Sequence, residues 1–178
     1  MRTSIRPDEL ARLGRLTEEA VVTELGVGYL LLAGGLPIAF ELPGPERSMQ
    51  PGKRGKSQWT LDLECYFAGQ RVTFDLDVNA YGKVHGFTDF ELAVYKALAK
   101  VPYGEAVSYR DLALAAGRPN AYRAVGSAMS RNALPVILPC HRVIKNDGRL
   151  GLYGDDPAWK ERLLALEGVH VVEGRVTA

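Results

Sequence analysis

The chain has 178 residues, 47% of them hydrophobic, and a formal net charge of +1. This length suits one domain or two small ones, and the apolar fraction is sufficient for a sizeable core. The sequence contains neither an apolar run of about eighteen residues nor the apolar block of a secretory signal, so we expect a cytoplasmic protein without a membrane span.

The cysteine and histidine content argues against a cross-linked or metal-bound protein. The two cysteines, Cys65 and Cys140, do not make the disulfide framework of a small secreted domain, and they indicate a reducing compartment. The three histidines add no pair of ligands at zinc spacing. We therefore expect no metal and no cofactor, and we expect Cys65 to pack as a small apolar residue.

Arginine is concentrated in one part of the chain. Between residues 105 and 150 there are seven basic and three acidic residues, and six of the seven are arginine. The planar guanidinium suits phosphate partners. A solvated charged face would explain the same pattern, and charge alone does not decide between them.

The first half of the chain is predicted to contain several strands. The segment VVTELGVGYLLLAGGLPIAFEL, residues 21–42, is typical of two or three short strands broken by glycine and proline. Residues 42–57 are rich in proline, glycine and charge and predict a surface loop. Residues 58–69, QWTLDLECYFAG, alternate like a strand, but their apolar side chains also share one helical face. Residues 71–78, RVTFDLDV, alternate cleanly and predict a strand.

Capping residues predict short helices in the second half. Thr88 and Glu91 have capping-box spacing at the start of TDFELAVYKALAKV. Ser108 and Asp111 repeat this spacing before YRDLALAA, which Gly117 ends.

Three further elements follow. Asn120 is expected to cap a third helix, AYRAVGSAMSRN, that Pro135 ends. The apolar run LPVILPCHRVI, residues 134–144, resembles a strand. Asp156 and Pro157 predict the start of a last helix, PAWKERLLALE, that Gly168 ends.

The helices predicted at YRDLALAA and AYRAVGSAMSRN are joined by AGRPN and have the spacing of a helix-turn-helix. The second helix carries Arg123 among small side chains, which are Ala121, Ala124, Gly126, Ser127, Ala128 and Ser130. Small side chains allow close approach, and a single arginine suits insertion into a narrow minor groove. A tight helix–helix contact with Arg123 in solvent would explain the same residues.

The thiol of Cys140 directly precedes His141. A thiol reacts as the thiolate, and an imidazole with a carboxylate behind it is the usual way to generate one, so we expect a thiol pKa of about 8.5 or lower. Adjacent residues on a strand point to opposite faces. The pair therefore needs a bridging water or a sharp bend, and Pro139 is consistent with a bend.

Two carboxylates are candidates for orienting His141. Glu167 ends the last helix, where the helix dipole disfavours negative charge, so it either has a partner or remains free at a small cost. Asp147 is the alternative. Asn132 can bond the thiol or cap its own turn. Local chemistry alone favours a cysteine hydrolase with a Cys-His-Glu arrangement.

The string YRAVGSAMSRNALPVILPCHRVI resembles the signature of the O6-alkylguanine-DNA alkyltransferases, also called methylated-DNA–protein-cysteine methyltransferases. PYGEAVSYRDLA and LEG extend the resemblance over residues 87–168. The first half is similar only in pattern, in CYFAGQRVTFDLDV, and this favours a helix over residues 58–68.

The resemblance implies an α+β fold with two domains. Residues 1–86 would form a small supporting α/β domain with a short antiparallel sheet, ribonuclease-H-like. Residues 87–178 would form a mostly helical, winged-helix-like domain that contains the helix-turn-helix and performs DNA binding and alkyl transfer.

The resemblance also implies a chemistry. Cys140 would take the alkyl group from guanine O6 in one in-line displacement, leaving a permanent thioether, so each molecule would react once. His141 would act through a water as base, with Glu167 orienting it and Asn132 positioning the thiol. Tyr109 would give a proton to the departing guanine.

The implied partner is duplex DNA that contains O6-alkylguanine, bound from the minor groove by a monomer. The target base must flip out, because O6 of a stacked guanine is out of reach of a buried thiol, and Arg123 would fill the space that it leaves. The implied DNA-binding residues are Ala121, Tyr122, Arg123, Gly126, Ser130 and Arg131. The implied pocket residues are Met129, Val143, Tyr153, Gly154 and Asp155, with the carbonyls of Cys140 and Val143 accepting from the guanine amino group.

The last loop departs from the family, since LYGDDP has Asp155 and Asp156 where glycines are usual. A carboxylate at the pocket mouth predicts weaker reaction with bulky O6-benzyl adducts than with O6-methylguanine. Two other functions stay open, a DNA-binding regulator or alkyl-damage sensor with a reactive thiol, and the hydrolase. The presence of Cys140 argues against sensors that lack the cysteine, and no glycine turn suited to an oxyanion hole surrounds it.

Overall fold

The structure is a computed structural model that describes residues 5–44, 56–154, 156 and 158–177. It confirms a mixed α+β fold, with a small antiparallel sheet and, among the described residues, seven α-helices. The chain divides into two compact units. One consists of Met1–Phe87 with Ala133–Pro135, and the other of Thr88–Asn132 with Val136–Ala178.

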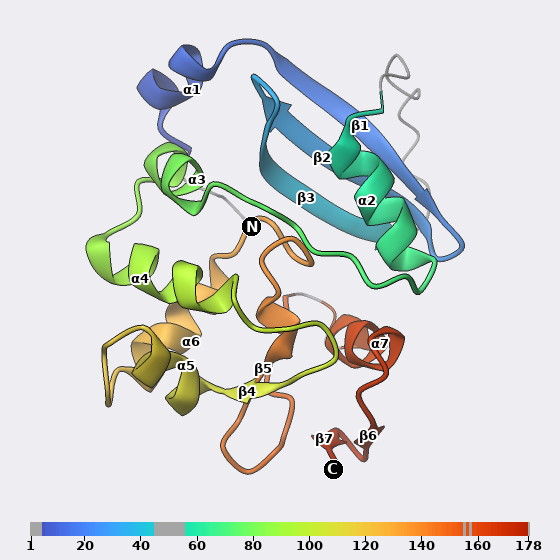
Figure 1. The fold of residues 1–178 in the computed structure, drawn as a ribbon, viewed down its shortest axis with the longest axis vertical. Helices are drawn as coiled ribbons and strands as arrows, with labels where there is room; N and C mark the ends of the chain where they lie inside the picture. The colour runs from blue at the N-terminus through green and yellow to red at the C-terminus, as the bar shows by residue number, and fades with distance from the viewer. Residues whose placement is uncertain (1–4, 45–55, 155, 157, 178) are drawn as a thin grey trace. The chain divides into compact units, whose positions relative to one another are not determined.

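The first unit contains a three-stranded antiparallel sheet in the order β1-β2-β3, with α2 beside it (Figure 1). Leu30 pairs with Phe40 across β2 and β3, and the Phe40 ring lies 6.2 Å from that of Phe67 on α2. The predicted strands, and the helix favoured by the resemblance, are therefore confirmed. The elements are α1 (Pro7–Leu13), β1 (Leu16–Thr23), β2 (Gly26–Ala33), β3 (Leu36–Gly44), α2 (Gln58–Phe67) and α3 (Val78–His85).

The loop predicted at residues 42–57 lies outside the described residues over 45–55. Its last residue, Ser57, caps α2, and its hydroxyl accepts from Thr60 N at 3.4 Å. Glu19 of β1 accepts from the hydroxyl groups of both residues, at 2.7 and 2.5 Å. The start of α2 is thereby fixed to the sheet.

The strand predicted over residues 71–78 is wrong. The segment joins no sheet, and Asp77 instead caps α3 by accepting from two backbone N–H groups of its first turn at 2.9 and 3.0 Å. Phe74 stacks on Trp59 of α2, with ring centroids 6.5 Å apart, and Leu76 is buried. The residues alternate because an extended segment packs one side on a helix, without a neighbouring strand.

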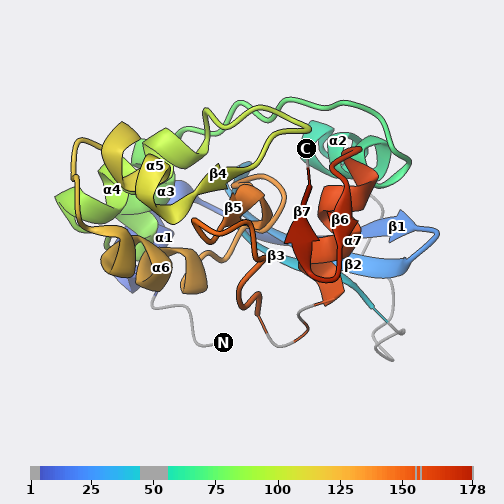
Figure 2. The ribbon, with the colours of Figure 1, turned by 90° about the horizontal axis from the view of Figure 1, so that it is seen from below.

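The second unit contains helices and two short two-stranded sheets (Figures 1 and 2). Helices α4, α5 and α6 pack against one another, while β4 and β5 pair in parallel. The elements are α4 (Asp89–Leu98), β4 (Val107–Ser108), α5 (Tyr109–Ala115), α6 (Tyr122–Ser130), the 3-10 helix η1 (Cys140–Arg142), β5 (Val143–Ile144), α7 (Ala158–Leu166), β6 (Val171–Val172) and β7 (Arg175–Val176).

Both predicted capping boxes are present. Thr88 Oγ1 accepts from Glu91 N at 3.2 Å, and Glu91 Oε2 accepts from Thr88 N at 2.9 Å. Ser108 and Asp111 exchange the same bonds at 3.0 and 3.4 Å. The predicted cap at Asn120 is wrong, because α6 has no side-chain cap and Asn120 has a φ of 73°, in the left-handed region that asparagine tolerates.

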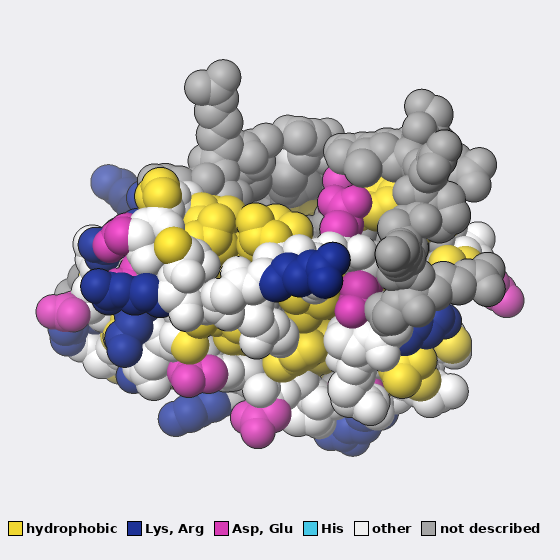
Figure 3. Space-filling model, turned by 90° about the horizontal axis from the view of Figure 1, so that it is seen from above, with side chains coloured by type: hydrophobic (Ala, Val, Ile, Leu, Met, Phe, Trp, Pro, Cys, Tyr) yellow, Lys and Arg dark blue, Asp and Glu magenta, His cyan; other side chains and the backbone are white. Residues whose placement is uncertain are grey.

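The face of the molecule drawn in Figure 3 carries apolar, basic and acidic side chains interspersed with one another. Across the described ranges, no helix combines the length and apolar character needed to cross a membrane.

Candidate active site

The segment around the thiol is a tight turn, so the strand predicted over residues 134–144 is wrong except at its end, Val143–Ile144. Cys140 begins the 3-10 helix η1, and its N–H donates to Leu138 O at 2.8 Å across Pro139, which supplies the bend. The aliphatic side chains before the cysteine, Leu134, Val136, Ile137 and Leu138, are all buried. Such a run does not distinguish a buried strand from a buried turn.

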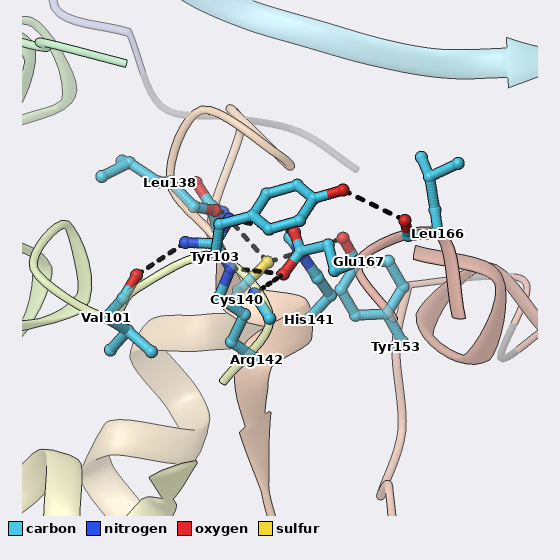
Figure 4. A network of polar contacts seen from close by, with 11 residues as sticks. Val101, Tyr103, Leu138, Cys140, His141, Arg142, Tyr153, Leu166 and Glu167 are labelled. Atoms are coloured by element: carbon cyan, nitrogen blue, oxygen red, sulfur yellow. Dashed lines mark hydrogen bonds and ion pairs between the residues drawn. The ribbon is translucent and has the colours of Figure 1, made fainter. Parts of the chain in front are cut away.

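The Cys140 thiol lies between an amide and a phenol. Asn132 Nδ2 donates to Cys140 Sγ at 3.0 Å and to Leu138 O at 2.8 Å, so one side chain both bonds the thiol and holds its turn. The thiol in turn donates to Tyr153 Oη at 3.7 Å (Figure 4). Cys140 and Asn132 are 7% and 8% exposed, so these weak bonds operate where water is largely excluded.

Glu167 is the carboxylate that holds His141 (Figure 4). His141 Nε2 lies 2.6 Å from Glu167 Oε1. Arg142 donates from Nη2 to Oε1 and from Nε to Oε2, both at 2.9 Å. Gly104 N also donates to Oε2, at 3.1 Å. The side chains of Glu167 and His141 are completely buried. Three partners, His141, Arg142 and Gly104, therefore fix the carboxylate away from water.

Arg142 connects this site to the loop after α4. Its Nη1 donates to Val101 O at 2.6 Å, and its guanidinium carbon lies 5.8 Å from the centroid of the Tyr103 ring. Tyr103 Oη donates to Leu166 O, at the end of α7, at 3.0 Å. The arginine and tyrosine thus hold the last turn of α7 where its glutamate meets the imidazole.

Asp147, the alternative orienting acid, is not near His141 in this network. It is exposed and accepts from Arg149 Nε at 2.7 Å and from Arg149 N at 3.1 Å. These bonds lower the pKa of Asp147 to about 2. It is a surface carboxylate paired with its neighbour.

Burial sets the protonation states of the thiol and the imidazole. It raises the pKa of Cys140, against the opposing hydrogen bonds with Asn132 and Tyr153. It also lowers the pKa of His141, against the opposing effect of Glu167. The expectation of a thiol pKa of about 8.5 or lower is therefore wrong, because burial outweighs the hydrogen bonds. The resting pair is a neutral thiol and a neutral imidazole.

Tyr109 is the first residue of α5 and is half-buried. Its ring lies next to Gly126 and its hydroxyl next to Gly151, where a Cβ atom would be 4.0 Å from the ring and 3.7 Å from the hydroxyl, both ordinary contact distances. Burial raises the pKa of Tyr109, and negative charge on Cys140 raises it further. The phenol is therefore protonated and able to donate.

Helix α6 presents most of the residues expected to bind DNA. Of these residues, Tyr122, Arg123 and Ser130 are exposed and Gly126 is partly exposed, as is Ala121 just before the helix. The helix packs on the rest of its unit through other residues, Val125, Ala128 and Met129, which are buried. The guanidinium of Arg123 lies 5.9 Å from the centroid of the Tyr122 ring. Arg131, just after the helix, forms an ion pair with Glu91 of α4, although its side chain is 59% exposed.

The expected pocket residues are only partly gathered. Tyr153 contacts the thiol, and Val143 follows η1 directly. Met129 is buried on α6, and Gly154 has a φ of 50°. Asp155 lies outside the described residues. Within the described ranges, no group of three or more His, Cys, Asp and Glu side chains is arranged to hold a metal ion.

Sequence reasoning missed Arg142 and Lys160, although the sequence contains a signal for each. Arg142 lies in an apolar run, where a charge needs a buried partner. Lys160 precedes Leu163, Leu164 and Glu167 by three, four and seven residues, a spacing that places all four on one face of a helix. That face is the buried one.

The Glu167 network makes stability depend on pH. Burial alone would raise the pKa of Glu167, but its hydrogen bonds with His141 and Arg142 outweigh burial and lower the pKa to about 2. A glutamate in the unfolded chain has a pKa of about 4.3, so the stabilisation is present above that pH and is lost as pH falls towards about 2. We expect a shallower fall of the free energy of unfolding over this range for Glu167→Gln than for wild type, measured by urea unfolding.

Glu161→Gln is the matched control for this prediction, because Glu161 is an exposed glutamate of α7, the helix that Glu167 directly follows. It should keep the wild-type slope. A wild-type slope in Glu167→Gln as well would contradict the role assigned to the buried carboxylate.

Comparisons with known proteins agree with this site. A family model described as the DNA binding domain of 6-O-methylguanine DNA methyltransferase matches residues 89–169. This range contains every residue of the thiol site described above.

Similarity to known proteins also extends into the first unit. A methylated-DNA–protein-cysteine methyltransferase of Methanosarcina barkeri is 41% identical over 154 residues, covering 82% of this chain and 94% of that protein. The structure of Mycobacterium tuberculosis O6-methylguanine methyltransferase matches with a TM-score of 0.67 and 32% identity, covering 86% and 93% of the two chains. The structure of Mycobacterium tuberculosis OGT in complex with DNA matches with a TM-score of 0.68 and 34% identity, covering 85% and 92%. The chain therefore belongs to the methylated-DNA–protein-cysteine methyltransferase family.

Proposed function

We propose that this protein repairs O6-alkylguanine in duplex DNA by moving the alkyl group to Cys140, once per molecule. The observation that carries the proposal is the buried Cys140 thiol bonded to Asn132, beside an imidazole that Glu167 holds at 2.6 Å. Membership of the methyltransferase family supports the same reaction, as does the complex of the similar M. tuberculosis OGT with DNA.

His141 receives the thiol proton. Its Nε2 is directed at the Glu167 carboxylate, so a neutral ring keeps its proton there and presents Nδ1 as the basic nitrogen. Cys140 and His141 are adjacent on a 3-10 helix with three residues per turn, so their side chains diverge and a water bridges them. The ionised Glu167 stabilises the positive charge that forms on the ring.

The thiolate then attacks the alkyl carbon in line with the bond to O6. A carbon–sulfur bond forms, the carbon–oxygen bond breaks, and the guanine leaves with the electron pair. Tyr109 supplies a proton to the departing base, consistent with its protonated state. Asn132 stabilises the thiolate through its N–H donor to sulfur. The thioether has no route back to a thiol, so the protein reacts once.

Helix α6 enters the minor groove, and Arg123 takes the place of the flipped base. Its exposed guanidinium and the exposed or partly exposed small residues around it support close approach to the duplex. The exposure of these small residues also argues against the alternative in which they are buried in a helix–helix contact. A phosphate contact by Arg131 has to compete with its ion pair to Glu91.

We also propose the finer fold and setting. The hairpin-linked order β1-β2-β3 with α2 beside the sheet supports a ribonuclease-H-like supporting domain. The packed α5 and α6 helices support a helix-turn-helix within a winged-helix-like domain. The protein acts as a cytoplasmic monomer, and the groups named above complete the reaction without a cofactor.

Mass measurement after incubation with duplex DNA containing O6-methylguanine tests the proposed reaction. Wild-type protein should gain one methyl group on Cys140 and no more. Cys140→Ser should bind the same DNA without gaining mass, because a hydroxyl ionises far less readily than a thiol. Binding without a mass change in the wild type would instead support a damage sensor, and repeated turnover would support a hydrolase.

Arg123→Ala separates base flipping from the chemical step. Without the side chain that replaces the flipped base, methyl transfer from duplex DNA should slow on the order of tenfold or more, whereas reaction with free O6-benzylguanine should stay within about twofold. Single-turnover rates with the two substrates measure both effects. Arg162→Ala, which removes an exposed arginine of α7, is the control and should leave both rates unchanged. An equal loss with both substrates would show that Arg123 is structural.

A further inference from the structure

Lys160 is a buried cation beside the thiol site. The residue is 1% exposed, and its Nζ donates to Val143 O at 2.5 Å. The same Nζ lies 5.8 Å from the centroid of the Tyr109 ring and 6.0 Å from that of Tyr153. Three elements of the site, α5, β5 and the loop before α7, therefore surround one ammonium group.

Among the described residues, no carboxylate balances this ammonium. Within the described part of the chain, Lys160 takes part in no ion pair, whereas the nearby Arg142 is paired with Glu167. Burying an ammonium without an opposite charge is costly. The neighbouring groups that can become negative are Cys140 and the phenols of Tyr109 and Tyr153. Burial lowers the pKa of Lys160 to about 8, and negative charge on Cys140 acts in the opposite direction.

We propose that Lys160 is a positioning residue that supplies the positive charge for the Cys140 thiolate and, through Val143 O, fixes the strand that follows the thiol. The inference deepens the proposed function, because it names how the buried thiol of that function is activated. During transfer the negative charge passes from Cys140 to the guanine and then, once Tyr109 has given up its proton, to the phenolate. The ammonium lies 5.8 Å from the ring centroid of the last of these groups, Tyr109, and its charge acts on the first, Cys140.

The other groups around the thiol do not supply this charge. Asn132 and Tyr153 are neutral partners of sulfur, and His141 is neutral at rest. Glu167 is negative but is paired with His141 and Arg142. Lys145 is the remaining cation, and its charge acts on Lys160 by lowering the pKa of that lysine. Lys160 is thus the buried, unpaired cation among the described groups of the site.

The ionisation of Cys140 in the absence of DNA tests this assignment. The rate at which iodoacetamide alkylates Cys140, followed by peptide mass mapping to exclude Cys65, gives a midpoint pH for the thiol. Lys160→Met removes the charge while keeping an unbranched side chain, and it should raise this midpoint by about one pH unit or more. Lys160→Arg retains the charge and should restore most of the shift. Lys96→Met, which removes an exposed lysine of α4, is the matched control and should have the wild-type midpoint.

An unchanged midpoint in folded Lys160→Met would overturn the proposal and make Lys160 a packing residue. The reciprocal measurement needs no change at Lys160. Coupling between two charges acts equally on both, so Cys140→Ser should lower the midpoint pH of the Lys160 ammonium, followed by the 13Cε chemical shift. An identical lysine titration in wild type and Cys140→Ser would also overturn it. Neither measurement uses DNA, so their failure is distinguishable from a failure of methyl transfer.

Discussion

The buried carboxylate of Glu167 is the group on which the arrangement of the thiol site depends. It lies at the C-terminal end of α7, where the helix dipole disfavours negative charge, and it is removed from water. Its charge is tolerated because Arg142, Gly104 and His141 all direct polar groups at it. The same bonds fix the imidazole and, through its neighbour in the chain, the position of the thiol.

Burial has opposite effects on the two groups that share the reacting proton. It makes the thiol of Cys140 harder to ionise and the imidazole of His141 harder to protonate. The resting site is therefore uncharged at these two residues. Charge separation becomes favourable only with the surrounding charges in place, negative Glu167 behind the imidazole and positive Lys160 beside the thiol.

Local patterns in the sequence predicted local structure well. The capping boxes at Thr88 and Ser108 needed only neighbours three residues away, and both formed. The strands predicted over 71–78 and before Cys140 failed because alternation, or an apolar run, records that side chains are buried and does not identify what covers them. Phe74 is covered by Trp59 of a helix and not by a strand.

The sequence identified many of the residues of the site but did not establish which hydrogen bonds join them. Local chemistry made Glu167 and Asn132 candidates, through a carboxylate at a helix end and an amide near the thiol. It left Asp147 and a turn cap open as alternatives, because residues 26 and 8 positions from their partners have no local pattern that joins them. Arg142 and Lys160 could have been identified from the rule that a charge among apolar residues needs a partner that balances it. Glu167 and His141 together generate the thiolate in the proposed reaction, and the single-turnover rate of methyl transfer from duplex DNA to Glu167→Gln tests this role. The rate should fall on the order of a hundredfold with unchanged DNA binding, and a rate within about twofold of wild type would show that the carboxylate is not needed to generate the thiolate.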